Sequence, residues 1–100
     1  MLRISIHELA DRVTIKLEGR VSGPWTTELG RTWQEFAPSL GPRKLSVDLS
    51  GLGFVDAAGT EILREIHQKT HAEFIADSPL AKYFAEQATN KFSGSGTKGA

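Results

Sequence analysis

Residues 44–63 have the sequence KLSVDLSGLGFVDAAGTEIL, and this stretch decides the fold. Apolar and polar side chains alternate over residues 45–49, which is the period of a strand with one buried face. The glycines and the serine of residues 50–53 are typical of a turn. Asp56 stands where a helix can begin, because its carboxylate can accept a hydrogen bond from a free backbone N–H and suits the helix dipole. The stretch predicts a strand, a tight connection and a helix over residues 57–70.

The composition limits the classes of protein to which the chain can belong. A length of 100 residues predicts one domain with one core. The 12 basic residues balance the 12 acidic ones, so the net charge favours neither nucleic acid nor an anionic membrane as a partner. The chain has no cysteine, which excludes disulfides and thiolate chemistry. We see no signal peptide and no apolar run of membrane-spanning length, and we expect a soluble cytoplasmic protein without direct membrane insertion.

The N-terminal half predicts a hairpin followed by a helix. Apolar and polar residues alternate over residues 2–7 and again over residues 13–18, and the connection between them is short enough for an antiparallel pair. A capping hydroxyl at Ser22 and a proline two residues later predict the start of a helix. We expect this helix over residues 24–37, ended by the prolines and the glycine that follow.

Aromatic residues recur along this first helix at helical spacing. Trp25, Trp33 and Phe36 lie on one stripe together with Leu29. Residues in such a stripe usually belong to the core, and we interpret them in this way. Trp25 has an alternative role, because an exposed tryptophan beside the loop at residues 22–24 would make a good interface anchor.

The C-terminal part predicts a short strand, a third helix and a tail. The strand covers residues 73–76, and Asp77-Ser78-Pro79 is a second helix start with a capping hydroxyl and a proline. Residues 93–100 consist of small and polar residues with nothing to bury, so we expect a domain over residues 1–92 and a flexible tail. The expected buried stripe of the third helix consists of Leu80, Tyr83, Phe84 and Ala88.

The order of elements is β-β-α-β-α-β-α, which predicts an α/β fold with a mixed four-stranded sheet. Strands that alternate with helices are expected to be parallel. A sheet covered on both faces has continuously apolar strands, whereas these strands alternate apolar and polar residues. We therefore expect the helices mainly on one face of the sheet and an open polar face opposite.

The sequence resembles the STAS domain, a family that joins sulfate transporters with anti-sigma factor antagonists. The resemblance covers residues 2–90 and depends on the element order, on Asp48-Leu49-Ser50-Gly51 and on Phe54-Val55-Asp56-Ala57-Ala58-Gly59. It implies a non-enzymatic regulatory module that docks on a histidine-kinase-like anti-sigma factor through the loop at residues 54–59. In such bacterial antagonists the partner phosphorylates a hydroxyl in this motif, usually the one just before the glycine, and the phosphate breaks the complex.

This chain departs from the family pattern at the modified position. Ala57 and Ala58 occupy both places where a hydroxyl would stand, and alanine cannot accept phosphate. The resemblance therefore implies a docking surface that has lost its usual phospho-acceptor at Ala58. Thr60 is the nearest hydroxyl and a possible alternative phosphosite, although a helix residue without a regulatory role is the commoner interpretation. We interpret Ser50 as a turn residue that bonds to its own backbone.

The expected partner is a protein, and two other functions stay open. One is an accessory subunit on the ATPase of a lipid-transporting ABC system, and the other is a domain that binds a nucleotide or another small ligand. The expected partner-binding residues are Ser22, Gly23, Trp25, Phe54, Asp56, Ala57, Ala58, Gly59, Thr60, Glu61 and Arg64.

The residues do not predict catalysis or a bound cofactor. Ser–His pairs, paired carboxylates and a phosphate-binding glycine loop with lysine are all missing from the sequence pattern. His67 and His71 have the spacing of two metal ligands on one helix face, but no third ligand is evident. We interpret them as surface histidines near a helix end, and we expect neither a metal nor a cofactor.

Overall fold

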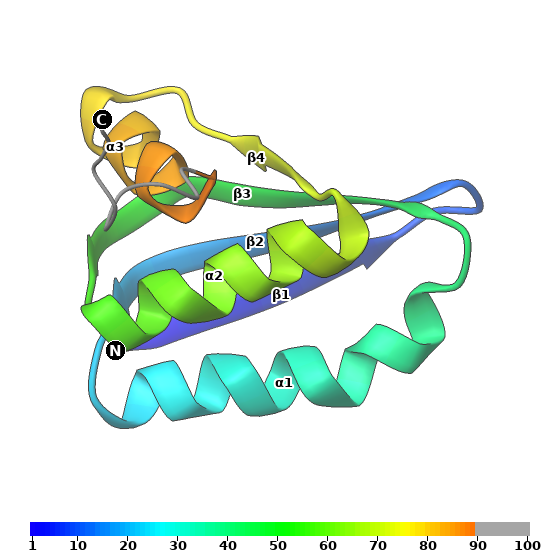
Figure 1. Ribbon diagram of the computed structural model, residues 1–100, viewed down its shortest axis with the longest axis horizontal. Helices are drawn as coiled ribbons and strands as arrows, with labels where there is room; N and C mark the ends of the chain where they lie inside the picture. The colour runs from blue at the N-terminus through cyan, green and yellow to red at the C-terminus, as the bar shows by residue number, and fades with distance from the viewer. Residues whose placement is uncertain (90–100) are drawn as a thin grey trace, which may run out of the picture.

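The computed structural model describes residues 1–89, so the expected tail at residues 93–100 and the domain boundary at residue 92 lie outside the described residues. Figure 1 shows the course of the chain. The elements are β1 (Leu2–Glu8), β2 (Arg12–Val21), α1 (Pro24–Leu40), β3 (Lys44–Val55), α2 (Ala57–Thr70), β4 (Glu73–Ile75) and α3 (Pro79–Thr89). The predicted element order is confirmed, and the helix over residues 57–70 has the predicted bounds.

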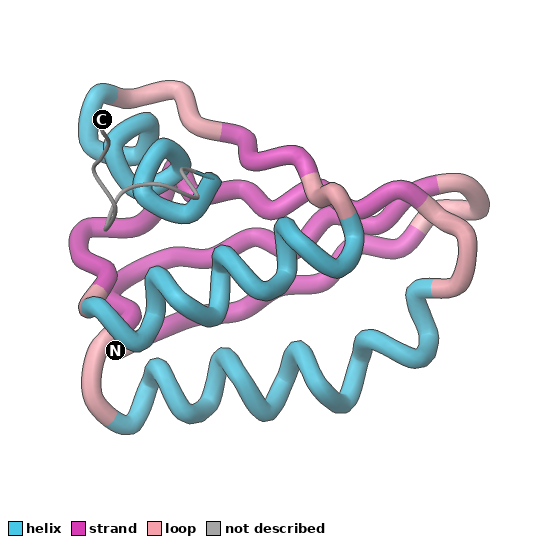
Figure 2. The backbone as a smooth tube through the Cα atoms, viewed as in Figure 1, coloured by secondary structure: helices cyan, strands magenta, loops and turns pink. Residues whose placement is uncertain are grey.

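The sheet is mixed and has the strand order β1-β2-β3-β4. Strands β1 and β2 form the predicted antiparallel hairpin, while β2, β3 and β4 run parallel to one another. Helices α1 and α2 connect the parallel strands, and both begin at the end of the molecule opposite the tip of the hairpin (Figures 1 and 2). The carboxyl ends of β2 and β3 therefore meet the first turns of α1 and α2 at one edge of the sheet.

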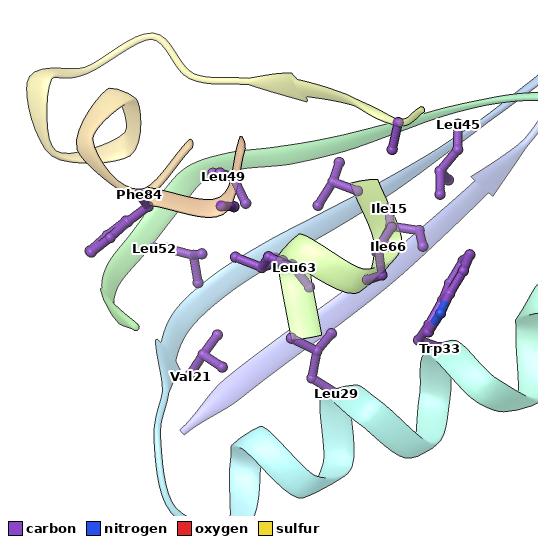
Figure 3. Close-up of a cluster of buried hydrophobic side chains, with 14 of the residues drawn as sticks. Ile15, Val21, Leu29, Trp33, Leu45, Leu49, Leu52, Leu63, Ile66 and Phe84 are labelled. Carbon is purple, nitrogen blue, oxygen red and sulfur yellow. The ribbon is translucent and has the colours of Figure 1, made fainter. Parts of the chain in front are cut away.

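The core lies between one face of the sheet and the helices. Alternate strand residues such as Val13, Ile15 and Leu17 are at most 4% exposed, and they form one cluster with buried residues of all three helices. The residues between them, such as Lys16 and Asp48, are partly exposed on the other face. This pattern confirms a sheet with one covered face and one open polar face. Figure 3 shows how the layers meet through Ile15, Val21, Leu29, Trp33, Leu45, Leu49, Leu52, Leu63, Ile66 and Phe84.

Strand β3 is longer than expected, and the predicted turn at residues 50–53 is wrong. The strand continues to Val55 and stays paired with β2 along this segment. Leu52 supplies the reason, because its side chain is 4% exposed in the core and holds the segment against the helices. Ser50 is therefore a strand residue, and its backbone N–H donates to Asp48 Oδ1 at 2.9 Å.

The glycines of this segment mark bulges in the strand. The register between β2 and β3 shifts between Lys16 and Glu18 and again between Gly19 and Arg20, and each shift leaves one extra residue on β3. Bulges are places where glycine is common within strands. At Gly51 a Cβ atom would lie 2.8 Å from Glu18 Cγ, so the close approach of the two strands also requires the glycine.

Helix α1 begins at Pro24 as predicted, but its cap and its C-terminal end differ from the prediction. Ser22 does not cap it; the N-cap is Gly23, whose φ of 56° lies in the left-handed region that favours glycine. At the other end the helix continues past Pro38 to Leu40, whose side chain is 7% exposed. Arg43 supports this last turn, because its guanidinium donates to the carbonyls of Leu40 at 3.0 Å and Ser39 at 2.6 Å.

Helix α3 begins as predicted, and Phe84 and Ala88 of its expected stripe are buried, but Leu80 and Tyr83 are not. Ser78 Oγ accepts a hydrogen bond from Ala81 N at 3.1 Å, which confirms the expected helix start. The buried residues are Ala81, Phe84 and Ala88, whereas Leu80 and Tyr83 are 46% and 54% exposed. The small alanines let this short helix lie close to the rest of the core, and the larger residues face outward.

Candidate functional site

The carboxyl ends of β2 and β3 form the base of the candidate site. Asp56 follows β3, and its backbone N–H donates to the carbonyl of Val21, the last residue of β2, at 2.8 Å. This bond ties the two strand ends together just before each chain segment turns into a helix. Segments 22–25 and 54–60 are thereby brought to one edge of the fold.

The Asp56 carboxylate joins the starts of both helices. Oδ1 accepts from Gly59 N at 2.7 Å, which is the predicted cap of α2, and also from the Thr26 hydroxyl at 2.9 Å. Oδ2 accepts from Gly23 N at 3.2 Å, at the start of α1. Burial acts to raise the pKa of Asp56, but the hydrogen bonds from Gly59, Thr26 and Gly23 lower it by more, so this pKa lies below its ordinary value.

Four apolar residues are exposed around these helix starts. Ala57 and Ala58 in the first turn of α2 are exposed, as the sequence analysis requires of a docking surface. Trp25 is 38% exposed and Phe54 is 42% exposed. Large exposed apolar side chains are informative when they gather in one place, because they mark candidate interaction surfaces.

Trp25 is therefore not a core residue, and its helical position explains why. The buried face of α1 consists of Thr26, Leu29, Trp33 and Leu40. Because Thr26 takes the inward position in the first turn, the residue before it points away from the core. The alternative role of Trp25, an exposed residue beside the loop at residues 22–24, agrees with this placement.

Phe54 points to the open face of the sheet because of the second bulge in β3. It pairs with Arg20 across the strands, and the Arg20 guanidinium lies 5.6 Å from the centre of the phenyl ring. A cation at this distance over a ring face is attracted to it. The apolar residues of the site consequently wrap around the edge of the sheet, from the helix starts to the open face.

Gly59, one of the residues expected at the partner contact, is buried in the structure. A Cβ atom at this position would lie 2.6 Å from Val21 Cγ1, 3.0 Å from Val55 Cγ1 and 3.1 Å from Asp56 Oδ1. The glycine is required because the first turn of α2 passes directly over the ends of β2 and β3. It shapes the surface without being part of it.

Arg64 is also less available than expected. Its side chain is 17% exposed, and its Nη2 donates to the carbonyl of Gln87 in α3 at 2.7 Å, while its Nη1 forms an ion pair with Glu61. The side chain is covered because α3 packs against this part of α2. Glu61 remains 70% exposed. Thr60 is half-buried, and its hydroxyl donates to the carbonyl of Asp56 at 3.1 Å.

A shallow groove of about 340 Å³ lies beside this surface, between α2 and α3. Its walls include Ala57, Thr60 and Glu61 from α2 and the exposed ring of Tyr83 from α3. The sequence pattern gave no indication of this groove, because it depends on how α3 packs against α2.

Thr26 is the site residue that the sequence analysis missed. It lies 30 residues from Asp56 in the chain, and a threonine in the first turn of a helix has no distinctive pattern. Ser22 is half-buried, and its carbonyl accepts from Trp25 N at 3.1 Å. Ser22 and Gly23 thus belong to the edge described above, as predicted.

His67 in α2 and His71, which follows it, have structural roles. His67 Nδ1 lies 2.9 Å from the carbonyl of Ala72, and its ring stacks on Phe74. His71 ends the helix in the left-handed conformation, with a φ of 57°. Within residues 1–89 no group of three or more His, Cys, Asp or Glu side chains is placed to hold a metal ion. Over the same residues no helix is long and apolar enough to cross a bilayer.

Comparison with known proteins identifies the fold. No protein-family model matches the sequence, and a search of curated proteins gave no match. The anti-sigma factor antagonist SpoIIAA in its unphosphorylated form matches with a TM-score of 0.63 and 14% sequence identity, over 84% of this chain and 83% of that one. A protein named Mglu matches with a TM-score of 0.57 and 17% identity, over 75% of this chain and 19% of Mglu. The STAS-like architecture expected from the resemblance is confirmed, and at this identity the likeness concerns the fold.

Proposed function

We propose that this chain is a non-enzymatic protein-binding module that acts as an anti-sigma factor antagonist. Its partner is a kinase-type anti-sigma factor, and its docking surface comprises the exposed residues of segments 22–25 and 54–60. The observation that carries the proposal is the exposure of Trp25, Phe54, Ala57 and Ala58 around two helix starts that Asp56 fixes. The likeness of the fold to an anti-sigma factor antagonist supports this choice of partner.

The chemistry of this surface suits contact with another protein. Large aromatic residues contribute strongly to interfaces, and small alanines let a partner approach the helix start closely. A rigid surface binds at a lower entropic cost than a flexible one. The Asp56 hydrogen bonds to Gly23, Thr26 and Gly59 hold the two helix starts in place next to these exposed residues.

The proposed module lacks the usual phosphate switch. A phosphate adds about −1.5 to −2 charges, and at a helix start the free N–H groups tolerate it locally. On an apolar docking surface the same charge would break the contact with the partner. Because residues 57 and 58 are alanines, the complex is expected to persist in the presence of ATP.

The experiment measures binding to a purified kinase-type anti-sigma factor from the same genome by calorimetry. Phe54→Ala is expected to weaken binding about tenfold or more, as truncation of an interface anchor does. The control is Leu9→Ala, which removes a side chain that is 61% exposed at the tip of the hairpin, far from the helix starts (Figure 1). Equal loss with both variants, or no binding by the unchanged protein, would overturn the proposal.

A second arm restores the missing hydroxyl. With ATP present, the unchanged protein is expected to keep its mass, and Ala58→Ser is expected to gain a phosphate and leave the complex. Ala57→Ser is the positional control, because the resemblance places the acceptor just before the glycine. A phosphate on Thr60 or Ser50 of the unchanged protein would contradict the loss of the switch.

A further inference from the structure

We propose that Thr26 is a positioning residue for the docking surface, holding the first turn of α1 against the first turn of α2 through the Asp56 carboxylate. The inference depends on the proposed function for its consequence in binding, but its structural part stands alone. The Thr26 hydroxyl donates to Asp56 Oδ1 at 2.9 Å and connects two helices whose bonded residues are 30 positions apart.

The burial of Thr26 indicates that this hydrogen bond is required at this position. Thr26 is 6% exposed, and among residues 1–89 it is the one buried residue with a polar side chain. A buried hydroxyl is costly unless it is paired, and a bond to a charged acceptor is stronger than one between neutral groups. Valine has nearly the same shape and would avoid this cost if the position needed only a packed side chain.

Farther along, the two helices meet through side-chain packing, for example where Ile62 of α2 lies against Gly30 of α1. A groove of about 440 Å³ separates α1 from α2 farther along, lined by Trp33, Ala37 and Pro38 on one side and by Glu65 and Lys69 on the other. At the helix starts themselves, the bridge through Asp56 joins α1 to α2 by hydrogen bonds.

The geometry separates the role of Thr26 from the capping of α2. Gly59 N donates to Asp56 Oδ1 within the same helix turn, so this bond can persist without Thr26. The bond from Gly23 N to Oδ2 is longer, at 3.2 Å, and depends on the carboxylate being turned toward α1. Loss of the Thr26 hydroxyl is expected to release the α1 side of the bridge alone, and with it the neighbouring Trp25.

The test compares Thr26→Val with two matched variants. Thr26→Ser keeps the hydroxyl, and Thr27→Val makes the same change at the next residue, which is exposed. Amide hydrogen exchange by NMR is the structural measurement. We expect faster exchange at Gly23 in Thr26→Val with little change at Gly59, and neither change in the other two variants.

Binding to the kinase-type anti-sigma factor is the functional measurement, made well below the unfolding temperature of each variant. Thr26→Val is expected to bind about threefold to tenfold more weakly, because the partner must then order the released turn. Thr26→Ser and Thr27→Val should bind like the unchanged protein.

Unchanged exchange at Gly23 in Thr26→Val would overturn the positioning role, and so would unchanged binding alongside faster exchange. If the unchanged protein does not bind at all, the proposed function fails, while the exchange data still decide whether Thr26 positions the helix start.

Discussion

Replacing Gly59 by alanine tests the packing beneath the docking surface. The new Cβ would lie 2.6 Å from Val21 Cγ1, closer than such atoms approach in proteins, and 3.0 Å from Val55 Cγ1. Val21 is fully buried and branched at Cβ, so it cannot turn away. Overpacking of this kind costs about 1–3 kcal/mol. Alanine recovers up to about 1 kcal/mol as the better helix former. We therefore expect a net loss of up to about 3 kcal/mol in the free energy of unfolding.

Gly30 provides the matched control, because it also lies within a helix. An alanine Cβ there would meet only the side chain of Ile62, with Cδ1 at 3.3 Å and Cγ1 at 3.9 Å. Cδ1 is the free end of a half-buried side chain and can move by a few tenths of an ångström. Gly30→Ala is expected to be neutral or to stabilise the protein by about 0.5–1 kcal/mol.

Urea unfolding followed by tryptophan fluorescence measures both variants against the unchanged protein. For a domain of this size, 1 kcal/mol corresponds to a change of about 4–8 °C in the unfolding temperature, so thermal unfolding gives a second reading. Gly59→Ala should lower stability, whereas Gly30→Ala should leave it unchanged or raise it. A Gly59→Ala protein as stable as the unchanged one would refute the claim that the start of α2 packs directly on the two strand ends.

Three further predictions concern other parts of the fold. Arg43→Lys should lose about 1–2 kcal/mol in urea unfolding, because one ammonium cannot replace a guanidinium that bonds three carbonyls; equal stability would contradict this clamp. His71→Gly should gain about 0.5 kcal/mol by the same measurement, since glycine adopts the left-handed conformation without strain, and a loss would count against it. The lowered pKa of Asp56 contributes stability above its unfolded value of about 3.9, and this contribution disappears as pH falls through the lower folded value. The stability difference between the unchanged protein and Asp56→Asn should therefore shrink as the pH falls below about 4, and a constant difference would exclude this linkage.

The periodic parts of the sequence predicted the architecture well. Each strand and helix buries one face. The apolar residues of that face therefore recur at the period of the element, as alternation in the strands and as helical spacing in α2, and this period can be recognised in the sequence. The cap at Asp56 was also predictable, because a carboxylate before an apolar helix has a local effect. The open face of the sheet followed from polar residues at alternate strand positions.

The parts that failed depend on contacts between distant segments. Gly51 looked like a turn residue, but the approach of β2 makes it a bulge in a continuing strand. Pro38 looked like a helix end, but buried Leu40 and the clamp from Arg43 extend the helix past it. Thr26 could not be recognised at all, since its role exists only when β2 and β3 lie side by side.

The structure shows where each residue of the candidate site lies, and some of these positions could be expected from the sequence. Ala57 and Ala58 are exposed as the docking interpretation requires, and the structure brings segments 22–25 and 54–60 to one edge. Gly59 and Arg64 lie in the segment expected to face the partner, but neighbouring elements cover them. Exposure at the level of single residues depends on tertiary packing, which periodicity does not resolve.

Hydrogen exchange measured by mass spectrometry, with and without the purified kinase-type anti-sigma factor, tests the docking surface most directly. The account predicts slower exchange in the complex over residues 22–25 and 54–60, and no change at the hairpin tip around Leu9. Protection confined to the groove between α1 and α2, or to the hairpin tip, would contradict it.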